Sequence, residues 1–314
     1  MLHPQARALL DLIAERGLPP MQSLSPVEAR LFYRERRAIT QPEAPPVAEV
    51  TELAADGPHG AIPLRLYRPT RRSDDPAPTP VLVYFHGGGW TIGDLDTHDV
   101  LCRQLANASR CAIVSVDYRM GPEHRFPAAV DDSLAATRWV HRHGASLGLD
   151  AARLGVGGDS AGGNLAAVVA LLARDAGDLP IACQLLIYPA TDMRCGHPSH
   201  AENGTGYLLE TPTIVYFRGN YVDDEARWLD WRASPLLRDD LSRLPPALVL
   251  TAGFDPLRDE GLDYANALVA AGNQATYVCF DRQIHGFITM GKMLDEANTA
   301  VALCAAEMAR LLSR

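Results

Sequence analysis

The sequence lacks the features that would assign it to a membrane-spanning, secreted or disulfide-stabilised class. No apolar run reaches the roughly 18 residues that are needed to cross a bilayer, and the first residues lack the basic start and apolar block of a signal peptide. The six cysteines are scattered without a C-x-x-C pair, and most lie in apolar segments, where a reduced thiol behaves as a small hydrophobic group. We therefore expect a cytoplasmic protein with no disulfides, no zinc site and no stable membrane association.

Clusters of basic residues are also absent. The net charge is −9, from 29 Lys and Arg residues against 38 Asp and Glu residues. A surface of this sign does not attract phosphate backbones or anionic lipid headgroups. We therefore expect no nucleic-acid partner.

What the chain does contain is a long alternation of strand-like and helix-like segments. Its 314 residues, 47% of them hydrophobic, are enough for one large α/β domain with an inserted or appended cap. The alternation predicts an eight-stranded, mostly parallel sheet with helices on both faces and an antiparallel pair of strands at one edge. The predicted strands are residues 47–54, 62–67, 81–85, 112–116, 154–156, 182–188, 247–251 and 276–280, and the predicted helices are 98–108, 128–147, 160–174, 258–271 and 294–312.

Two segments break this alternation and are predicted to form a helical cap. Residues 1–40 carry apolar side chains at helical spacing, and Ser25-Pro26 followed by Glu28 is typical of a helix start. Residues 190–235 form a long insertion at the carboxyl end of a strand, with a helix near 212–221. We therefore divide the chain into N-terminal cap helices (1–45), a main domain (46–189 and 236–314) and a cap insertion (190–235).

A glycine-rich turn around Ser160 lies between a short apolar strand and an Ala/Leu-rich helix. Gly158 and Gly162 bracket the serine in the pattern G-x-S-x-G. A turn this tight strains the central residue and crowds its neighbours, which glycine tolerates. The hydroxyl is then held at the carboxyl end of a strand, beside a helix N-terminus that can stabilise negative charge. This pattern predicts a nucleophile elbow.

Three consecutive glycines follow the strand at 81–85. A loop that turns its N–H groups toward a ligand needs backbone angles that a Cβ atom penalises, and acyl transfer needs such donors for its tetrahedral oxyanion. The position of the loop, upstream of the elbow, favours an oxyanion hole made by the N–H groups of Gly88, Gly89 and Ala161.

A serine nucleophile needs a base, and the base needs an orienting carboxylate. His285 lies in a loop between the last strand and the last helix, and Asp255 follows a strand and precedes Pro256 at a helix start. Asp259 is one turn into that helix and is interpreted as a partner of the helix dipole. The other histidines lie in polar or loop contexts and are predicted at the surface, except His86, which we expect to brace the glycine loop; the predicted surface set includes His3, His59, His98, His141, His143, His197 and His200.

At this point the chain resembles the microbial esterases of the hormone-sensitive lipase family (family IV). The matching blocks are His86-Gly87-Gly88-Gly89-Trp90, Gly158-Asp159-Ser160-Ala161-Gly162-Gly163, Asp255-Pro256-Leu257-Arg258-Asp259, His285-Gly286-Phe287 and the stretch from Asp117 to Ala129. Within that stretch, Met120-Gly121 stands where the family more usually has Leu-Ala. The resemblance covers nearly the whole chain, and the combined blocks are specific although no single one is. The aspartate that the family has in its elbow is present as Asp159, and we interpret it as structural.

The resemblance implies the α/β-hydrolase fold and hydrolysis of carboxylic esters with short to medium acyl chains, without metal or cofactor. Ser160 would attack the ester, His285 would take its proton, and Asp255 would orient His285. The expected partner is a small-molecule ester, with a homodimer left open by the sequence. We also expect Trp90, Tyr188, Leu208 and Phe287 to line the substrate pocket.

Two alternatives remain open from the sequence. An amidase or peptidase would use the same three residues and differ only in the leaving group. A small-molecule receptor on this fold, such as the related plant hormone receptors, would lack the catalytic histidine, and the intact set Ser160, Asp255 and His285 disfavours it.

Overall fold

The computed structural model describes residues 1–70 and 77–313. None of the helices in these ranges combines the length and apolar composition that crossing a membrane would take. In chain order, the helices and strands are α1 (Pro4–Glu15), α2 (Pro26–Thr40), β1 (Glu49–Gly57), β2 (Gly60–Arg68), β3 (Thr79–Phe85), α3 (Asp99–Ser109), β4 (Ala112–Val116), α4 (Ala128–His143), β5 (Leu149–Asp159), α5 (Ala161–Ala176), β6 (Gln184–Ile187), α6 (Pro198–Glu202), α7 (Thr211–Tyr221), β7 (Ala247–Phe254), α8 (Arg258–Ala270), β8 (Ala275–Ile284) and α9 (Asp295–Leu312).

The strands of the described residues form one eight-stranded sheet, as the sequence predicts. Its order is β1-β2-β4-β3-β5-β6-β7-β8. Strands β1 and β2 pair antiparallel at one edge, β2 also pairs antiparallel with β4, and every other neighbouring pair is parallel. The carboxyl ends of the six parallel strands therefore lie at one end of the sheet, which is where catalytic loops are built on such folds.

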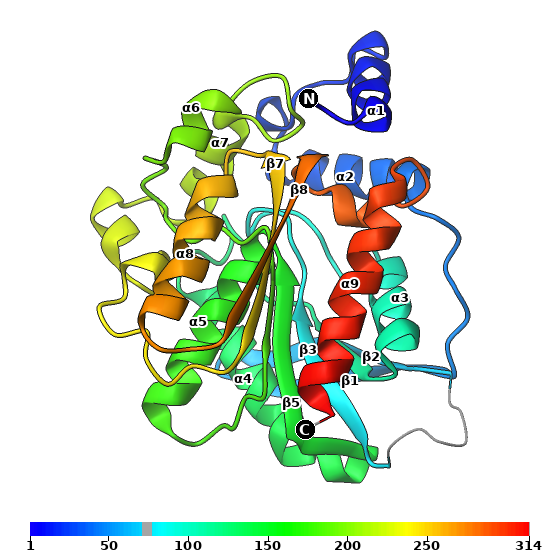
Figure 1. Ribbon diagram of the computed structural model, residues 1–314, viewed down its shortest axis with the longest axis vertical. Helices are drawn as coiled ribbons and strands as arrows, with labels where there is room; N and C mark the ends of the chain where they lie inside the picture. The colour runs from blue at the N-terminus through cyan, green and yellow to red at the C-terminus, as the bar shows by residue number, and fades with distance from the viewer. Residues whose placement is uncertain (71–76, 314) are drawn as a thin grey trace.

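Helices cover both faces of the sheet because its central strands are apolar on both sides. In β3, Val81, Val83 and Phe85 face the core shared with α4, α5 and α8, whereas Leu82 and Tyr84 face the core shared with α3 and α9. Figure 1 shows these two groups of helices on opposite sides of the sheet. The period-2 alternation of a strand thus supplies both cores at once.

The two segments that interrupt the alternation lie above the carboxyl ends of the strands (Figure 1). Helix α2 begins with the predicted signal: the Ser25 hydroxyl accepts from the N–H of Glu28, the Glu28 carboxylate accepts from the N–H of Ser25, and Pro26 follows the cap. A short 3-10 turn at Met21–Ser23 contacts α7, and the Gln22 and Thr213 side chains are hydrogen-bonded at 2.9 Å. The two segments are therefore in direct contact.

We expect Asp117→Asn to stabilise the protein at pH 7.5 but not at pH 4. Burial, with Asp94 and Asp96 nearby, raises the pKa of Asp117 to about 6. A raised carboxyl pKa favours the protonated form, so the stability it contributes is complete below about pH 4 and is lost as the pH rises through about 6. Asparagine stays neutral at both pH values. A gain of about 1–2 kcal/mol at pH 7.5, or roughly 2–6 °C in Tm, should be seen by thermal unfolding; an equal gain at both pH values would contradict the assignment.

Candidate active site

Ser160 occupies the turn that joins β5 to α5, and its backbone is strained as the sequence predicts. Its φ and ψ are 56° and −116°, a region that costs a non-glycine residue about 1–3 kcal/mol. A Cβ atom on Gly162 would lie 1.9 Å from the carbonyl oxygen of Phe85, and one on Gly158 would lie 2.3 Å from the same oxygen. The Ser160 N–H donates to the carbonyl of Ile187 at 2.8 Å. Because neither glycine carries a Cβ atom, the turn can approach β3 and β6 closely, and these contacts fix the conformation of the turn.

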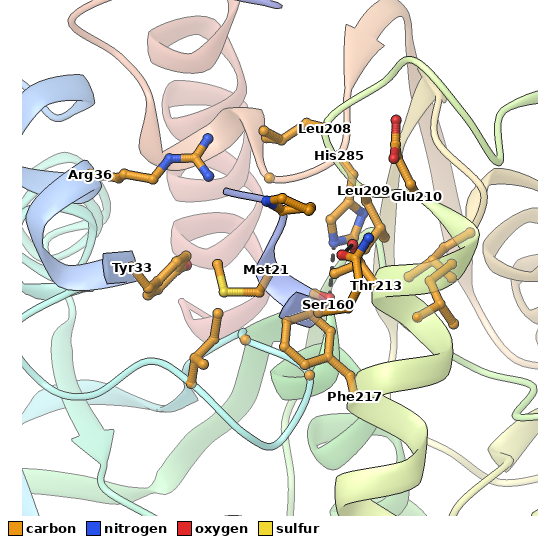
Figure 2. A pocket seen from close by; sticks show the side chains of 18 of the residues that line it. Met21, Tyr33, Arg36, Ser160, Leu208, Leu209, Glu210, Thr213, Phe217 and His285 are labelled. Carbon is orange, nitrogen blue, oxygen red and sulfur yellow. Dashed lines mark hydrogen bonds between the residues drawn. The ribbon is translucent and has the colours of Figure 1, made fainter. Parts of the chain in front are cut away.

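The structure brings Ser160, His285 and Asp255 into one hydrogen-bonded chain. His285 Nε2 lies 3.0 Å from Ser160 Oγ (Figure 2), and His285 Nδ1 lies 2.7 Å from Asp255 Oδ2. Asp255 is fully buried, and its Oδ1 accepts from the N–H of Leu257 at 2.8 Å. Because an ionised carboxylate only accepts, His285 donates Nδ1–H to Asp255 and presents the Nε2 lone pair to the serine hydroxyl.

The neighbouring acid Asp259 does not take part in this chain. Its carboxylate accepts from the N–H of Ser199 at 2.8 Å and from Arg258 Nε at 2.7 Å. The sequence prediction that Asp255 rather than Asp259 faces His285 agrees with these contacts.

The glycine loop is held open beside Ser160. Gly88 and Gly89 have φ values of 126° and 58°, and the Gly88 carbonyl accepts from the N–H groups of Thr91 and Ile92. Among the described residues, the N–H groups of Gly88, Gly89 and Ala161 donate to no acceptor. Ala161 is the first residue of α5, where the N–H groups of a helix are free and its dipole favours an anion. These donors therefore have the character that an oxyanion site requires.

Asp159 anchors the glycine loop from below. It is buried, and its Oδ1 accepts from Tyr84 Oη at 2.7 Å and from the N–H of Gly87 at 2.9 Å. His98 Nε2 lies 3.2 Å from the same oxygen. Burial alone would raise the pKa of Asp159, but His98 and the other donors hold that pKa well below its usual range. The structural role predicted for Asp159 agrees with this arrangement.

Some histidine predictions are wrong. His98 and His200, both expected at the surface, are buried. His86 does brace the loop: its Nδ1 lies 2.9 Å from the Gly87 carbonyl and its ring stacks on Tyr118 at 4.4 Å. Burial, with His98 nearby, lowers the pKa of His86 to about 4, so its ring is neutral at physiological pH. A polar sequence context did not reveal these positions because residues distant in sequence supply the burial.

A cavity of about 480 Å³ opens above Ser160 and His285. Trp90 and Leu208, two of the four residues predicted to line the pocket, lie in its wall. Tyr188 and Phe287 do not: both are fully buried, with Tyr188 packed against the His285 ring at 4.6 Å and Phe287 behind Tyr188. They support the catalytic histidine from the side of the core. The wall also includes residues outside the four predicted for the pocket, among them Met21, Tyr33, Arg36, Glu210 and Phe217 (Figure 2).

The fold and this geometry define the class of protein as an α/β hydrolase. The sequence profile of the family described as alpha/beta hydrolase fold matches residues 82–289. The chain therefore belongs to that family, and within it to the hormone-sensitive lipase-like (family IV) microbial esterases. It is an ester hydrolase, which disfavours the receptor alternative.

Relatives and solved structures support this placement. The chain is 47% identical to the carboxylic ester hydrolase LipN of Mycobacterium tuberculosis, over 77% of this chain and 65% of LipN, so it spans about two thirds of that relative. It is 39% identical to an ethyl acetate hydrolase of Pseudomonas putida, over 96% of each chain. A solved ester hydrolase from the metagenome of Lake Arreo, complexed with a bipyridine phosphonate derivative, is 44% identical with a TM-score of 0.95, and the match covers 100% of each chain.

Proposed function

We propose that Ser160, His285 and Asp255 hydrolyse carboxylic esters with short to medium acyl chains. The observation that carries the proposal is the hydrogen-bonded chain from Ser160 Oγ through His285 to Asp255, with the free N–H groups of Gly88, Gly89 and Ala161 beside it. A nucleophile, a base, an orienting acid and an oxyanion site are thus within reach of one ester group.

The reaction proceeds in two halves. In the first, His285 Nε2 takes the Ser160 proton as Oγ attacks the ester carbonyl, and the oxyanion lies against the free N–H groups. The tetrahedral intermediate collapses, His285 gives its proton to the leaving alcohol, and Ser160 keeps the acyl group. In the second half, His285 removes a proton from water, the hydroxide attacks the acyl carbonyl, and the carboxylic acid leaves as Ser160 regains its proton. Asp255 holds the imidazole orientation and stabilises its charged form throughout.

The N-terminal helices (1–45) and the insertion (190–235) form, in this proposal, one cap that limits acyl length. Met21 and Tyr33 come from the first segment, and Leu208 and Phe217 from the second, and all four line the cavity. A Cβ atom on Gly89 would lie 2.2 Å from the Phe217 ring, so this ring packs directly on the oxyanion loop. The cap is therefore placed to close on the acyl group near the reacting carbonyl.

We expect Phe217→Ala to shift the acyl preference to longer chains. The shorter side chain leaves room for two more methylene groups, each worth about 0.8 kcal/mol when buried. The ratio of kcat/KM for an ester two carbons longer to that for the ester preferred by the wild type should therefore rise by about tenfold. Initial rates on nitrophenyl esters with two to twelve acyl carbons measure the profile. Tyr216→Ala is the matched control, because Tyr216 lies next to Phe217 on α7 and does not line the cavity. An identical profile in Phe217→Ala and the wild type would count against a role for α7 in acyl selection.

Arg36 gives the cavity wall a positive charge. Its guanidinium carbon lies 5.3 Å from the centroid of the Phe32 ring, and it forms no ion pair within residues 1–70 and 77–313. Figure 2 shows Arg36 and Glu210 on opposite sides of the Ser160–His285 pair. The proposed substrates therefore include esters whose acyl group ends in a carboxylate that reaches the Arg36 side.

We expect Arg36→Met to remove this preference. The ratio of kcat/KM for a carboxylate-terminated ester to that for its neutral counterpart of equal length should fall by about 10- to 150-fold, the effect of one hydrogen bond to a charged group. Arg34→Met is the control, because Arg34 is on the same helix but pairs with Asp94 outside the cavity. An unchanged ratio in Arg36→Met would reject the assignment and leave the esterase proposal standing.

A further inference from the structure

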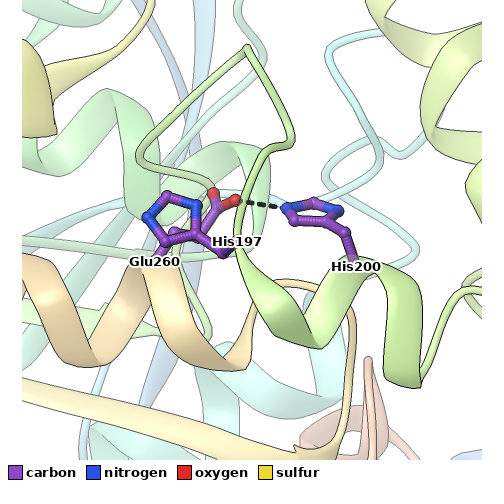
Figure 3. Close-up of side chains that lie close together, drawn as sticks. All are labelled: His197, His200 and Glu260. Carbon is purple, nitrogen blue, oxygen red and sulfur yellow. Dashed lines mark hydrogen bonds and ion pairs between the residues drawn. The ribbon is translucent and has the colours of Figure 1, made fainter.

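A second cluster of chemistry-bearing side chains lies beside the catalytic centre, where the cap insertion contacts α8. His197 and His200 lie at the start of α6, and Glu260 lies in the first turn of α8. One ligand atom from each residue lies within 4.8 Å of the other two. Figure 3 shows the Glu260 carboxylate between the two imidazole rings. None of the three belongs to the Ser160–His285–Asp255 chain.

The His197 ring has one nitrogen occupied and one free. Its Nε2 lies 3.3 Å from Asp263 Oδ2, an ion-pair contact in which the carboxylate favours the tautomer with the proton on Nε2. Nδ1 is therefore left with a lone pair, and it is buried without a hydrogen-bond partner. A buried acceptor without a partner is costly. A histidine whose far nitrogen is held by a carboxylate, with its near nitrogen free, has the arrangement of a metal ligand with its outer-sphere partner.

Glu260 is a fully buried carboxylate, and a histidine is its only charge-bearing hydrogen-bond partner among the described residues. Its Oε1 accepts from the N–H groups of Thr191 and Asp192, and its Oε2 lies 2.8 Å from His200 Nε2.

The neighbouring arginines are engaged elsewhere. Arg194 pairs with Asp192, and Arg258 pairs with Glu202 and Asp259. A buried anion in such a place is stabilised by pairing or by metal coordination, so a divalent cation would complete the local balance of charge.

We propose that His197 Nδ1, His200 Nε2 and Glu260 Oε2 bind one divalent transition-metal ion of the Zn²⁺ type. Two imidazole nitrogens and one carboxylate oxygen form a donor set that Zn²⁺ favours, with water as the fourth ligand. His200 would change tautomer, so that its proton moves to Nδ1 and the hydrogen bond to Glu260 is replaced by two metal bonds. Small side-chain rotations bring the ligand atoms from their present spacing to bonding distance.

The ion would join the cap insertion to α8, which begins three residues after Asp255. Its role is structural, because its ligands do not contact the reacting atoms, and it is compatible with metal-free ester hydrolysis. This proposal differs from the prediction made from the sequence, which was that the protein has no metal site. That prediction rested on the cysteine pattern and on assigning His197 and His200 to the surface; the overlooked signal is His-x-x-His at the start of a helix.

The test is Zn²⁺ binding to the intact, chelator-treated protein, followed by competition with a chromophoric chelator and by thermal unfolding. We expect one equivalent to bind and Tm to rise with zinc concentration, as for any ligand that binds only the folded state. Asp263→Asn should weaken binding by about 10- to 100-fold, the usual effect of losing an outer-sphere partner, and His197→Ala by at least as much. His197 is suited to this test because Asp263 is its only hydrogen-bonding or ion-pair partner among the described side chains. His59→Ala, an exposed histidine far from the cluster in sequence, should bind as the wild type does.

Two results would overturn the proposal. One is the absence of any Tm shift in the wild type. The other is equal affinity in the wild type and His197→Ala; if hydrolysis were lost in parallel with that binding, zinc would lie on His285 instead. Neither result affects the esterase proposal, which is tested by activity without added metal.

Discussion

Replacing Ser160 with alanine is expected to lower kcat for a nitrophenyl ester by about four to six orders of magnitude. The substitution removes the only atom that forms the covalent bond to the acyl group. The residual rate comes from binding and from the oxyanion donors, which remain in place. Single-turnover and steady-state rates on the purified variant measure the loss, with thermal unfolding to show that the fold is intact.

Ser115→Ala is the matched control for this experiment. Ser115 is a buried serine in β4, so its replacement changes the core to a similar extent without touching the site. We expect its kcat to stay within a few-fold of the wild type. A folded Ser160→Ala protein that keeps most of its kcat would exclude Ser160 as the nucleophile.

Asp255→Asn is expected to lower kcat by about 10⁴-fold, the effect known for an orienting carboxylate of this kind. The amide can donate to His285 Nδ1, which favours the tautomer with a proton on Nε2 and so removes the lone pair that faces Ser160 Oγ. The charged imidazole also loses its counter-ion. KM should change little, because Asp255 is fully buried and does not contact the substrate.

Asp259→Asn separates this effect from a general loss of charge at the start of α8. Asp259 lies four residues further on and binds Ser199 and Arg258 rather than His285. We expect its kcat to fall by less than about tenfold, since exposed or half-exposed pairs contribute little. A larger loss in Asp259→Asn than in Asp255→Asn would show that Asp259, and not Asp255, is the acid that orients His285.

The strands and helices were predictable where one local pattern determines them. Strand β4 has the predicted bounds because its five residues are apolar and fully buried. The length of strand β5 was underestimated. The strand begins at Leu149, five residues before the predicted start, and its first part includes the charged residues Asp150 and Arg153. That segment pairs with β3 across an irregularity at Pro80/Val81, and such pairing depends on the partner strand rather than on local composition.

In the candidate site, too, the features set by a local sequence pattern were predictable, and those set by tertiary contacts were not. The turn at Ser160 and the loop at Gly88 and Gly89 were predictable because their backbone angles demand glycine at fixed positions. The cavity wall was predictable only in part, since Arg36 and Phe217 come from two segments, residues 1–45 and 190–235, that meet only in three dimensions. Buried histidines such as His98 were missed for a related reason: their burial and partners come from elements far away in the chain.

The most direct test of the central assignment is covalent labelling with a nitrophenyl alkylphosphonate, followed by peptide mass spectrometry. The reagent mimics the tetrahedral intermediate and is attacked only by an activated nucleophile held beside oxyanion donors. The structure predicts one phosphonyl group per chain, located on Ser160, with activity lost in proportion to labelling and no adduct in Ser160→Ala. A stoichiometric adduct on another residue, formed as activity disappears, would contradict the assignment of Ser160 as the nucleophile.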